Sequence, residues 1–352
     1  MSRLAICIVL SILLQGCSTM AYYWEKVQGH ADILNNQRPI QEAIRDPATA
    51  KETKQRLINA KKAREFATVT LKLPDNDSYR NYVDINRDYA VWTVVATPPY
   101  STKPKQWCFL IVGCLSYRGY FSEQKANEFA AQLKEQNMDV YVSGTKAYST
   151  LGWFDDPLLS SMLYKSEAYR VGIIFHELAH QQFYLQDDTA FNEAFASTVE
   201  LQGIKLWFEE NKKLQEYKQY RVAKKRDEQF KQLLQDTRQV LMAHYQSTKN
   251  TSELKAGKLA IFNQLKEKYT ALKTKWGDYD GYDRWMSQPL NNAHLAMIAT
   301  YNDLIPAFKK IYLNANKNFT VFYKQVEALA EKPKKQRDLY LNSLMPAGYA
   351  RQ

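Results

Sequence analysis

A short polar motif beside an apolar run constrains this chain most: His176-Glu177-Leu178-Ala179-His180 follows Gly172-Ile173-Ile174-Phe175. Such an apolar run is typical of a buried helix. On a helix, residues four apart are separated by about 40° around the axis, so His176 and His180 present their imidazoles from one face. That spacing suits two ligands of one Zn²⁺ ion. Glu177 lies beside the pair and is the candidate general base for a catalytic water molecule.

The whole chain has only five histidines, and two of them occupy this motif. A chance match in a chain so poor in histidine is uncommon. The competing interpretation is a pair of core histidines whose hydrogen bonds are satisfied within the protein. The apolar, helix-compatible residues before the motif favour the metal site over that interpretation.

A catalytic zinc site needs a third protein ligand and one open position. Glu193 supplies a carboxylate, with twelve residues between it and His180. Asp187, Asp188 and Glu200 are alternatives for the third ligand. Glu200 lies seven residues after Glu193 on the same helical face, and is better placed to orient a ligand histidine.

The segment Asn192-Glu193-Ala194-Phe195-Ala196, together with Glu200, resembles the Asn-Glu-x-x-Ala helix of the gluzincin peptidases. In that family the glutamate of the motif is the third zinc ligand. The resemblance therefore implies that His176, His180 and Glu193 bind one Zn²⁺ per chain. Because the spacing is shorter than in the better-known gluzincins, the connection between the two helices must be tight.

Further strings extend the resemblance over nearly the whole chain, to the predicted aminopeptidases of Gram-negative lipoproteins. They are Trp107-Cys108-Phe109, Val112-Gly113-Cys114, 117–121, 147–153, Asp155-Asp156-Pro157 and Leu290-Asn291-Asn292-Ala293, with Tyr301 and Pro306. The family implies an α+β fold in which a zincin-like small sheet and an active-site helix are embedded in a mainly helical chain. It also implies a peptide substrate and cleavage from the amino terminus.

Gluzincins stabilise the tetrahedral oxyanion with a Tyr or His from a neighbouring helix. By this resemblance Tyr301 is the candidate, with His294 as the second choice. Tyr301 also stands at helical spacing from Leu304, Ile305 and Phe308, and can equally be a core aromatic.

Two further segments are candidates for binding the substrate. Residues 145–152 are predicted to form an edge strand to which an extended peptide adds, with an ordinary surface loop as the alternative. Asp155 and Asp156 are candidates for holding the substrate's ammonium group. An Asp-Asp-Pro sequence is also a good helix start, and that interpretation is favoured.

The amino terminus has the pattern of a lipoprotein signal. Arg3 precedes an apolar run from Leu4 to Leu14, and the sequence Leu14-Gln15-Gly16-Cys17 follows. Such a run is too short to span a bilayer stably, and cleavage before Cys17 leaves that cysteine for acylation. We therefore expect a periplasmic lipoprotein anchored at Cys17, sorted to the outer membrane by Ser18. Because Gln15 is not the most favoured residue in this pattern, an ordinary secretory signal is the alternative.

Cys108 and Cys114 remain once the signal is removed and Cys17 is acylated. An oxidising periplasm permits them to pair. A fully extended run of six residues holds its ends about 20 Å apart, so a disulfide requires the segment between them to bend. The alternative is two small buried side chains.

The net charge of +11 does not indicate nucleic acid binding. The basic residues are spread over helical stretches, without interleaved aromatics or a recognition motif. A solvated helical surface near anionic lipid headgroups accounts for them.

The apolar pattern divides the chain into a signal peptide (1–16), an anchor and N-terminal helical region (17–85), a zincin-like catalytic region (86–205) and a helical C-terminal region (206–352). It predicts two helices within 38–73 divided near Pro47, strands at 90–96, 107–115 and 139–142, and a helix at 122–136. Further helices are predicted at 209–244, 252–276 and 292–312.

These observations predict a zinc peptidase of the cell envelope. Two alternatives stay open. One is a zinc amide hydrolase acting on cell-wall material, because zinc chemistry does not depend on what flanks the amide. The other is a non-catalytic scaffold lipoprotein, although all the motif residues are present.

Overall fold

A computed structural model describes residues 22–109, 113–147, 150, 154–247, 250–297 and 304–346. Helices dominate this part of the chain, and its strands form one two-stranded and two three-stranded sheets. The predicted helix-rich α+β class is therefore confirmed. None of the helices in the described ranges is both long and apolar enough to cross a bilayer.

The N-terminal region begins with a helix over residues 22–35. Strand β1 (Arg38–Pro39) leads directly into α2 (Ile40–Arg45), and α3 (Lys51–Val69) follows. The two helices separate around Pro47, as the sequence predicts, because proline disfavours helical geometry in the residue before it.

A buried arginine fixes the loop that follows α3. The guanidinium of Arg64 donates hydrogen bonds to the carbonyl oxygens of Ser78, Pro74 and Asn76, at 2.8 to 2.9 Å. This loop leads into β2 (Asn81–Val83), which pairs with β1 and, in parallel, with β8 (Leu158–Leu159). The short helix α5 (Ser160–Leu163) continues from β8.

The main sheet has the order β6-β3-β7 and is antiparallel throughout. It consists of β6 (Arg118–Tyr120), β3 (Val91–Thr97) and β7 (Asp139–Thr145). Helix α4 (Glu123–Glu135) packs its alanines and Leu133 against Val94, Ala96 and Val140. Its N-cap is Ser122, whose side chain accepts a hydrogen bond from the Lys125 amide, as expected.

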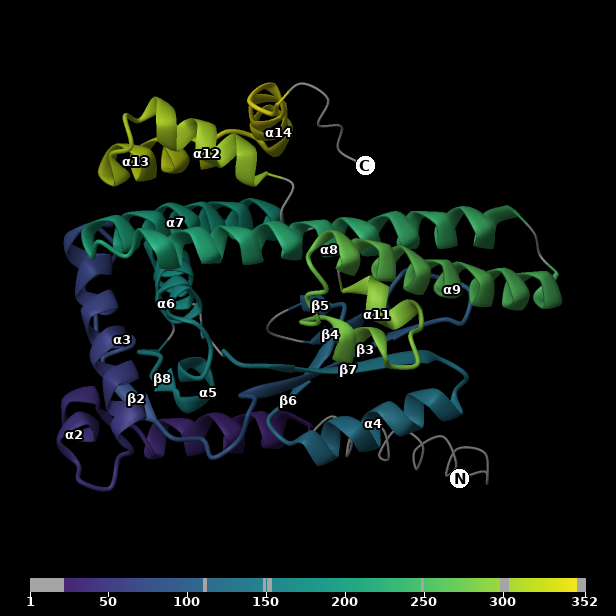
Figure 1. Cartoon of the computed structure of the whole chain (residues 1–352), viewed down its shortest axis with the longest axis horizontal. Coiled ribbons are helices and arrows are strands. Elements are labelled where there is room, and N and C mark those ends of the chain that lie inside the picture. The colour runs from purple at the N-terminus through teal and green to yellow at the C-terminus, as the bar shows by residue number, and fades with distance from the viewer. Residues whose placement is uncertain are drawn as a thin grey trace, which may run out of the picture.

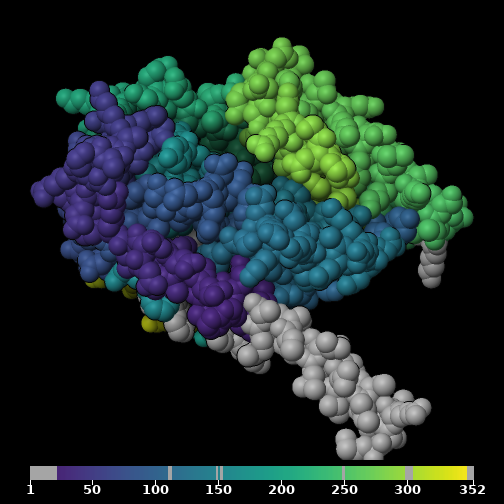
Figure 2. Space-filling view, turned by 90° about the horizontal axis from the view of Figure 1, so that it is seen from below, coloured from purple at the N-terminus to yellow at the C-terminus, as the bar shows by residue number. Residues whose placement is uncertain are grey.

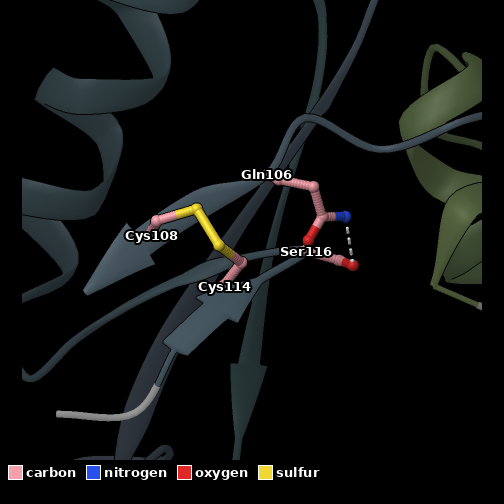
Figure 3. The surroundings of a disulfide bond; sticks show 4 residues. All are labelled: Gln106, Cys108, Cys114 and Ser116. Carbon is pink, nitrogen blue, oxygen red and sulfur yellow. Dashed lines mark hydrogen bonds between the residues drawn. A yellow bond between two sulfur atoms is a disulfide. The ribbon is translucent and has the colours of Figure 1, made fainter. Parts of the chain in front are cut away.

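The apolar run 107–115 does not form one strand beside 90–96. It folds back on itself into β4 (Trp107–Phe109) and β5 (Gly113–Leu115), a separate antiparallel pair. Cys108 lies directly opposite Cys114, and a disulfide joins them with a Cα–Cα distance of 3.9 Å. Gln106 also donates a hydrogen bond to the Ser116 hydroxyl at 2.8 Å, on the same hairpin (Figure 3).

The largest core lies around two long helices, α6 (Glu167–Gln182) and α7 (Thr189–Glu210), which pack closely with α3. Figure 1 shows α6 running away from α7 toward the level of α5 and β8, with α12 (Ile305–Asn314), α13 (Phe319–Ala330) and α14 (Lys334–Ser343) covering the other side of α7. The three C-terminal helices contribute Phe308, Phe322 and Leu341 to this core.

Helices α8 (Leu214–Ser247) and α9 (Thr251–Lys275) form a long antiparallel hairpin (Figure 1). Their own apolar cluster is completed by α10 (Asp283–Met286) and α11 (Asn292–Ala296).

The predicted single helix over 292–312 is wrong: α11 ends at Ala296, and α12 starts afresh at Ile305 with Pro306 in its first turn. Proline is favoured at a helix start and disrupts a helix interior. The predicted boundaries at residues 85 and 205 stay predictions.

Candidate metal centre

Helix α6 places the two histidines of the motif on one face. Its N-cap is Ser166, whose hydroxyl accepts a hydrogen bond from the Tyr169 amide, and it ends at Phe183, which is extended. His176 and His180 stand one turn apart, and their Nε2 atoms are 3.2 Å from one another. The spacing of four residues therefore brings the two imidazoles together on one face of the helix, as the sequence predicts.

Glu193 reaches the same point from α7. Its carboxylate oxygens lie 3.5 Å from Nε2 of His176 and 3.6 Å from Nε2 of His180. His180 is 4% exposed and Glu193 is 32% exposed, so the site is closed behind the histidine and reachable beside the carboxylate. All three ligand atoms lie within 4.8 Å of one another.

These distances permit a test of whether a metal fits. Two atoms that each lie about 2.1 Å from one tetrahedral zinc ion are about 3.4 Å apart. The three observed separations lie on either side of that value. Two imidazole nitrogens and a carboxylate also form the donor set that zinc takes in catalytic sites. His176, His180 and Glu193 therefore form a site that can hold a metal ion.

The connection between α6 and α7 is tight, as the short spacing requires. Asn192, directly before Glu193, clamps it: the side-chain oxygen accepts a hydrogen bond from the Leu185 amide at 2.8 Å, and the side-chain nitrogen donates to the Leu185 carbonyl at 2.7 Å. Asp188 caps α7 and accepts hydrogen bonds from Arg337 and Lys334. Asp187 occupies the turn with φ +60°. Asp188 thus has another role, and neither carboxylate belongs to the group formed by His176, His180 and Glu193.

Glu200 lies behind His176. One carboxylate oxygen is 3.1 Å from Nδ1 of His176, on the side of the ring opposite the metal-facing nitrogen. A carboxylate in this position fixes the orientation of the imidazole ring and makes it a stronger ligand. Glu200 is thus placed to orient a ligand rather than to be one.

Gly172, one turn before His176, makes the room that Glu200 occupies. A Cβ atom at Gly172 would lie 2.8 Å from Ile204 and 3.2 Å from the Glu200 carboxylate. The equivalent position in α7 is Gly203, where a Cβ would lie 2.7 Å from Leu71 and 2.8 Å from Phe175. Glycine in a helix interior costs about 1 kcal/mol relative to alanine. Here it permits the two helices to approach closely.

The surroundings of the site shift the pKa values of His176 and His180 in opposite directions. Burial lowers the pKa of His176, but hydrogen bonds to Glu193 and Glu200 and the charge of Glu177 outweigh burial and raise this pKa to about 10. Burial and the neighbouring His176 lower the pKa of His180 to about 4. The histidine contacts hold the pKa of Glu193 below its usual value, despite its burial. Without a metal, His176 carries the proton at neutral pH.

The end of α6 is also tied to the N-terminal region. Gln181, next to His180, accepts a hydrogen bond from Asn76 at 2.7 Å and donates one to the Ser78 hydroxyl at 3.1 Å. These residues belong to the loop that Arg64 holds. Local spacing does not indicate this contact, since it joins segments about a hundred residues apart.

The other predicted site residues lie elsewhere or outside the described ranges. Tyr301, Cys17 and part of 145–152 fall outside them. His294 shares a capping box with Asn291 and stacks on Tyr141 of β7 at 4.1 Å, so its contacts are those of a structural residue. The Asp156 carboxylate accepts hydrogen bonds from the amide and hydroxyl of Thr150. Pro157 precedes strand β8, so the predicted helix start there is wrong.

Helices α6 and α7 thus bring two histidines and one carboxylate together in a site that can hold a metal ion. The family described as "Putative aminopeptidase" matches residues 21–341. The chain belongs to this family, whose description indicates an enzyme of the peptidase type. No curated protein and no solved structure significantly matches the chain.

We expect Gly172→Ala to weaken metal binding about 10- to 100-fold, because the new methyl group crowds Ile204 and the Glu200 carboxylate that supports His176, and the loss of such supporting contacts has effects of that size. Zinc affinity can be measured by competition with a chromophoric chelator. The matched control is Gly203→Ala, which crowds Leu71 and Phe175 instead. The control should have a lower free energy of unfolding, while its folded form should bind zinc as tightly as the wild type. Equal affinities for Gly172→Ala and the wild type would contradict this role of Gly172.

Metal binding should release about one proton per zinc ion at neutral pH, because His176 is protonated in the metal-free protein and a ligand must be neutral. The affinity should therefore rise about tenfold per pH unit between the pKa values of His180 and His176. In the metal-free protein, the raised pKa of His176 contributes stability that is complete below pH 6.5 and lost as the pH rises toward 10. Calorimetry in buffers of different ionisation enthalpy measures the proton release. If no proton is released on zinc binding, His176 is not the protonated ligand of the metal-free site.

Proposed function

We propose that this protein is a zinc-dependent aminopeptidase of the cell envelope. The observation that carries the proposal is the convergence of His176, His180 and Glu193, with ligand atoms within 4.8 Å of one another. The peptidase class follows from the family, and the donor set supports zinc. A bound Zn²⁺ ion would polarise the scissile carbonyl and make a nearby water molecule more acidic.

Glu177 is the proposed general base. It adjoins His176 on α6, is half-buried, and lies close enough to His176 and Tyr169 for its charge to raise both pKa values. The carboxylate accepts a proton from the attacking water and then donates it to the leaving amine. Because Glu193 holds the metal and Glu200 holds His176, Glu177 is the remaining carboxylate of this group that can carry the proton.

The substrate is proposed to be a peptide that binds in extended form along residues 145–152, which begin at the last residue of β7. This strand pairs with β3 on one side, and in the described part of the sheet it is an edge strand. At Val140 this edge is already occupied, because the Val140 carbonyl accepts a hydrogen bond from the Asn291 side chain at 3.0 Å. An added strand would therefore pair beyond that point, toward Thr145. Oxyanion stabilisation by Tyr301 remains part of the proposal.

We further propose that the protein is a lipoprotein anchored at Cys17 in the outer membrane. The signal-like sequence before Cys17 supports this location. The disulfide between Cys108 and Cys114 adds support, since such bonds form and persist in oxidising compartments such as the periplasm.

The proposed function can be tested with a form beginning at Ser18, assayed for zinc content and for hydrolysis of short peptides. Glu177→Gln should retain zinc and lower kcat/KM about 10²- to 10⁴-fold, the usual contribution of a general base. Glu209→Gln, at the exposed end of α7, is the matched control and should behave as the wild type. Peptides with an acetylated amino terminus should not be cleaved by an aminopeptidase.

Different outcomes would contradict different parts of the proposal. Cleavage of acetylated peptides would overturn the amino-terminal specificity. Zinc binding with turnover of peptidoglycan fragments alone would favour the cell-wall amide hydrolase. A wild-type protein that binds zinc and hydrolyses none of these substrates would favour the scaffold. Full activity in Glu177→Gln would remove the proposed base.

A further inference from the structure

The first described helix carries an exposed apolar pair. On helix 22–35, Trp24 is 63% exposed and Val27 is 59% exposed. Residues three apart lie on the same side of a helix, so the two side chains form one face. Trp24 is the one strongly exposed tryptophan among those the structure describes. Single apolar residues on a surface are ordinary, so exposure alone does not mark this pair as a binding surface.

The opposite side of the same helix is firmly packed. Glu25 is buried, and its carboxylate accepts hydrogen bonds from the amides of Phe121 and Ser122, at 2.6 and 3.1 Å. Gly29 lies directly against the Phe121 ring, which leaves no room for a Cβ atom. Figure 2 shows the helix lying across this face beside the segment that contains α4. The apolar pair therefore points outward from a fixed helix.

The disulfide hairpin braces the start of the helix. The Phe109 ring of β4 stacks on Tyr22, with 5.5 Å between ring centroids, and meets Tyr23 edge-on. Arg118 of β6 lies over the Tyr22 ring at 4.0 Å. Because the Cys108–Cys114 bond holds this hairpin, the first helical turn is held in a defined position relative to the body of the protein.

The length of chain before the helix limits where this turn can lie. Tyr22 lies five positions after Cys17, and a fully extended chain covers at most about 18 Å in five steps. This step rests on the proposed acylation of Cys17. If the acyl chains are in a bilayer, Tyr22 lies within that distance of its surface, and Trp24 and Val27 follow within one turn.

The cations near this turn stabilise the packed side of the helix. The Lys26 ammonium is buried and lies 2.9 Å from the Glu25 carboxylate, and Arg118 lies over the Tyr22 ring. The exposed face is therefore apolar and aromatic rather than charged. Tryptophan is favoured at the boundary between headgroups and acyl chains of a bilayer.

We propose that the face formed by Trp24 and Val27 docks on the surface of the bilayer that holds the acyl anchor. The anchor and this face then contact the membrane at two adjacent points, which restricts rotation of the protein about its lipid. In Figure 1 helix 22–35 and α4 lie on the side opposite α7 and the three C-terminal helices. Docking therefore orients α7 and its C-terminal cover away from the bilayer.

The test uses the non-acylated form that begins at Ser18 and vesicles of phosphatidylethanolamine and phosphatidylglycerol, with binding measured by co-sedimentation. The wild type should bind, and Trp24→Ser/Val27→Ser should lower the partition coefficient about tenfold or more, because burial of these two side chains contributes more than the ~1.4 kcal/mol of a tenfold change. The matched control is Val240→Ser/Leu259→Ser, which removes exposed apolar residues from α8 and α9 and should bind as the wild type. Val27→Glu is a second variant that should also weaken binding, in case the double variant folds poorly.

Several results would overturn the docking face. The first is that the wild type does not bind vesicles. The second is that the Trp24→Ser/Val27→Ser variant binds as strongly as the wild type. The third is that the control variant loses as much vesicle binding as the Trp24→Ser/Val27→Ser variant. A dimer that the Trp24 substitution dissociates would assign the surface to a second copy instead. Peptide hydrolysis is measured on the same samples without vesicles. Failure of the proposed peptidase activity would thus be seen separately from failure of docking.

Discussion

The close packing of α6 against α7 is the constraint on which the metal centre depends. One helix carries both histidines and the general-base candidate, and the other carries Glu193 and Glu200. The two carboxylates reach different nitrogens of the His176 ring. Gly172 leaves room for Glu200 beside His176, and Gly203 leaves room for Leu71 and Phe175. A larger residue at Gly172 must therefore displace a side chain that supports the metal site.

The electrostatics of the site follow from this packing. The carboxylates of Glu177, Glu193 and Glu200 lie around the partly buried imidazole of His176. Their negative charges must be balanced by a nearby positive charge. A proton on His176 meets this need in the metal-free protein. A divalent ion meets it with more charge and with the ligand distances already present. The surrounding hydrogen bonds, from Asn192 on one side and Gln181 on the other, hold the two helices in position for either state.

The parts of this centre that local periodicity determines could be predicted from the sequence. Residues four apart on a helix must share a face, so the positions of His176, His180 and Glu177 followed from their spacing. Glu200 was expected behind His176 for the same reason, seven residues from Glu193. The caps at Ser122 and the break near Pro47 likewise depend on neighbouring residues alone.

The remaining features depend on contacts between distant segments, which spacing does not encode. The loop held by Arg64 contacts Gln181 across about a hundred residues, and Arg337 pairs with Asp188 across a longer span. The run 107–115 has strand propensity throughout, so propensity alone did not indicate that it turns back on itself. The hairpin has Gly113 at φ +71°, a conformation that glycine adopts without strain. The role of Tyr301 stays a prediction.

The most direct test of the metal centre is a crystal structure of the zinc-loaded protein, with anomalous diffraction recorded on both sides of the zinc absorption edge. We expect one anomalous peak per chain, bonded to Nε2 of His176, Nε2 of His180 and a carboxylate oxygen of Glu193, with Glu200 on the far side of the His176 ring. A peak bonded to other residues, or none at these three, would contradict this expectation.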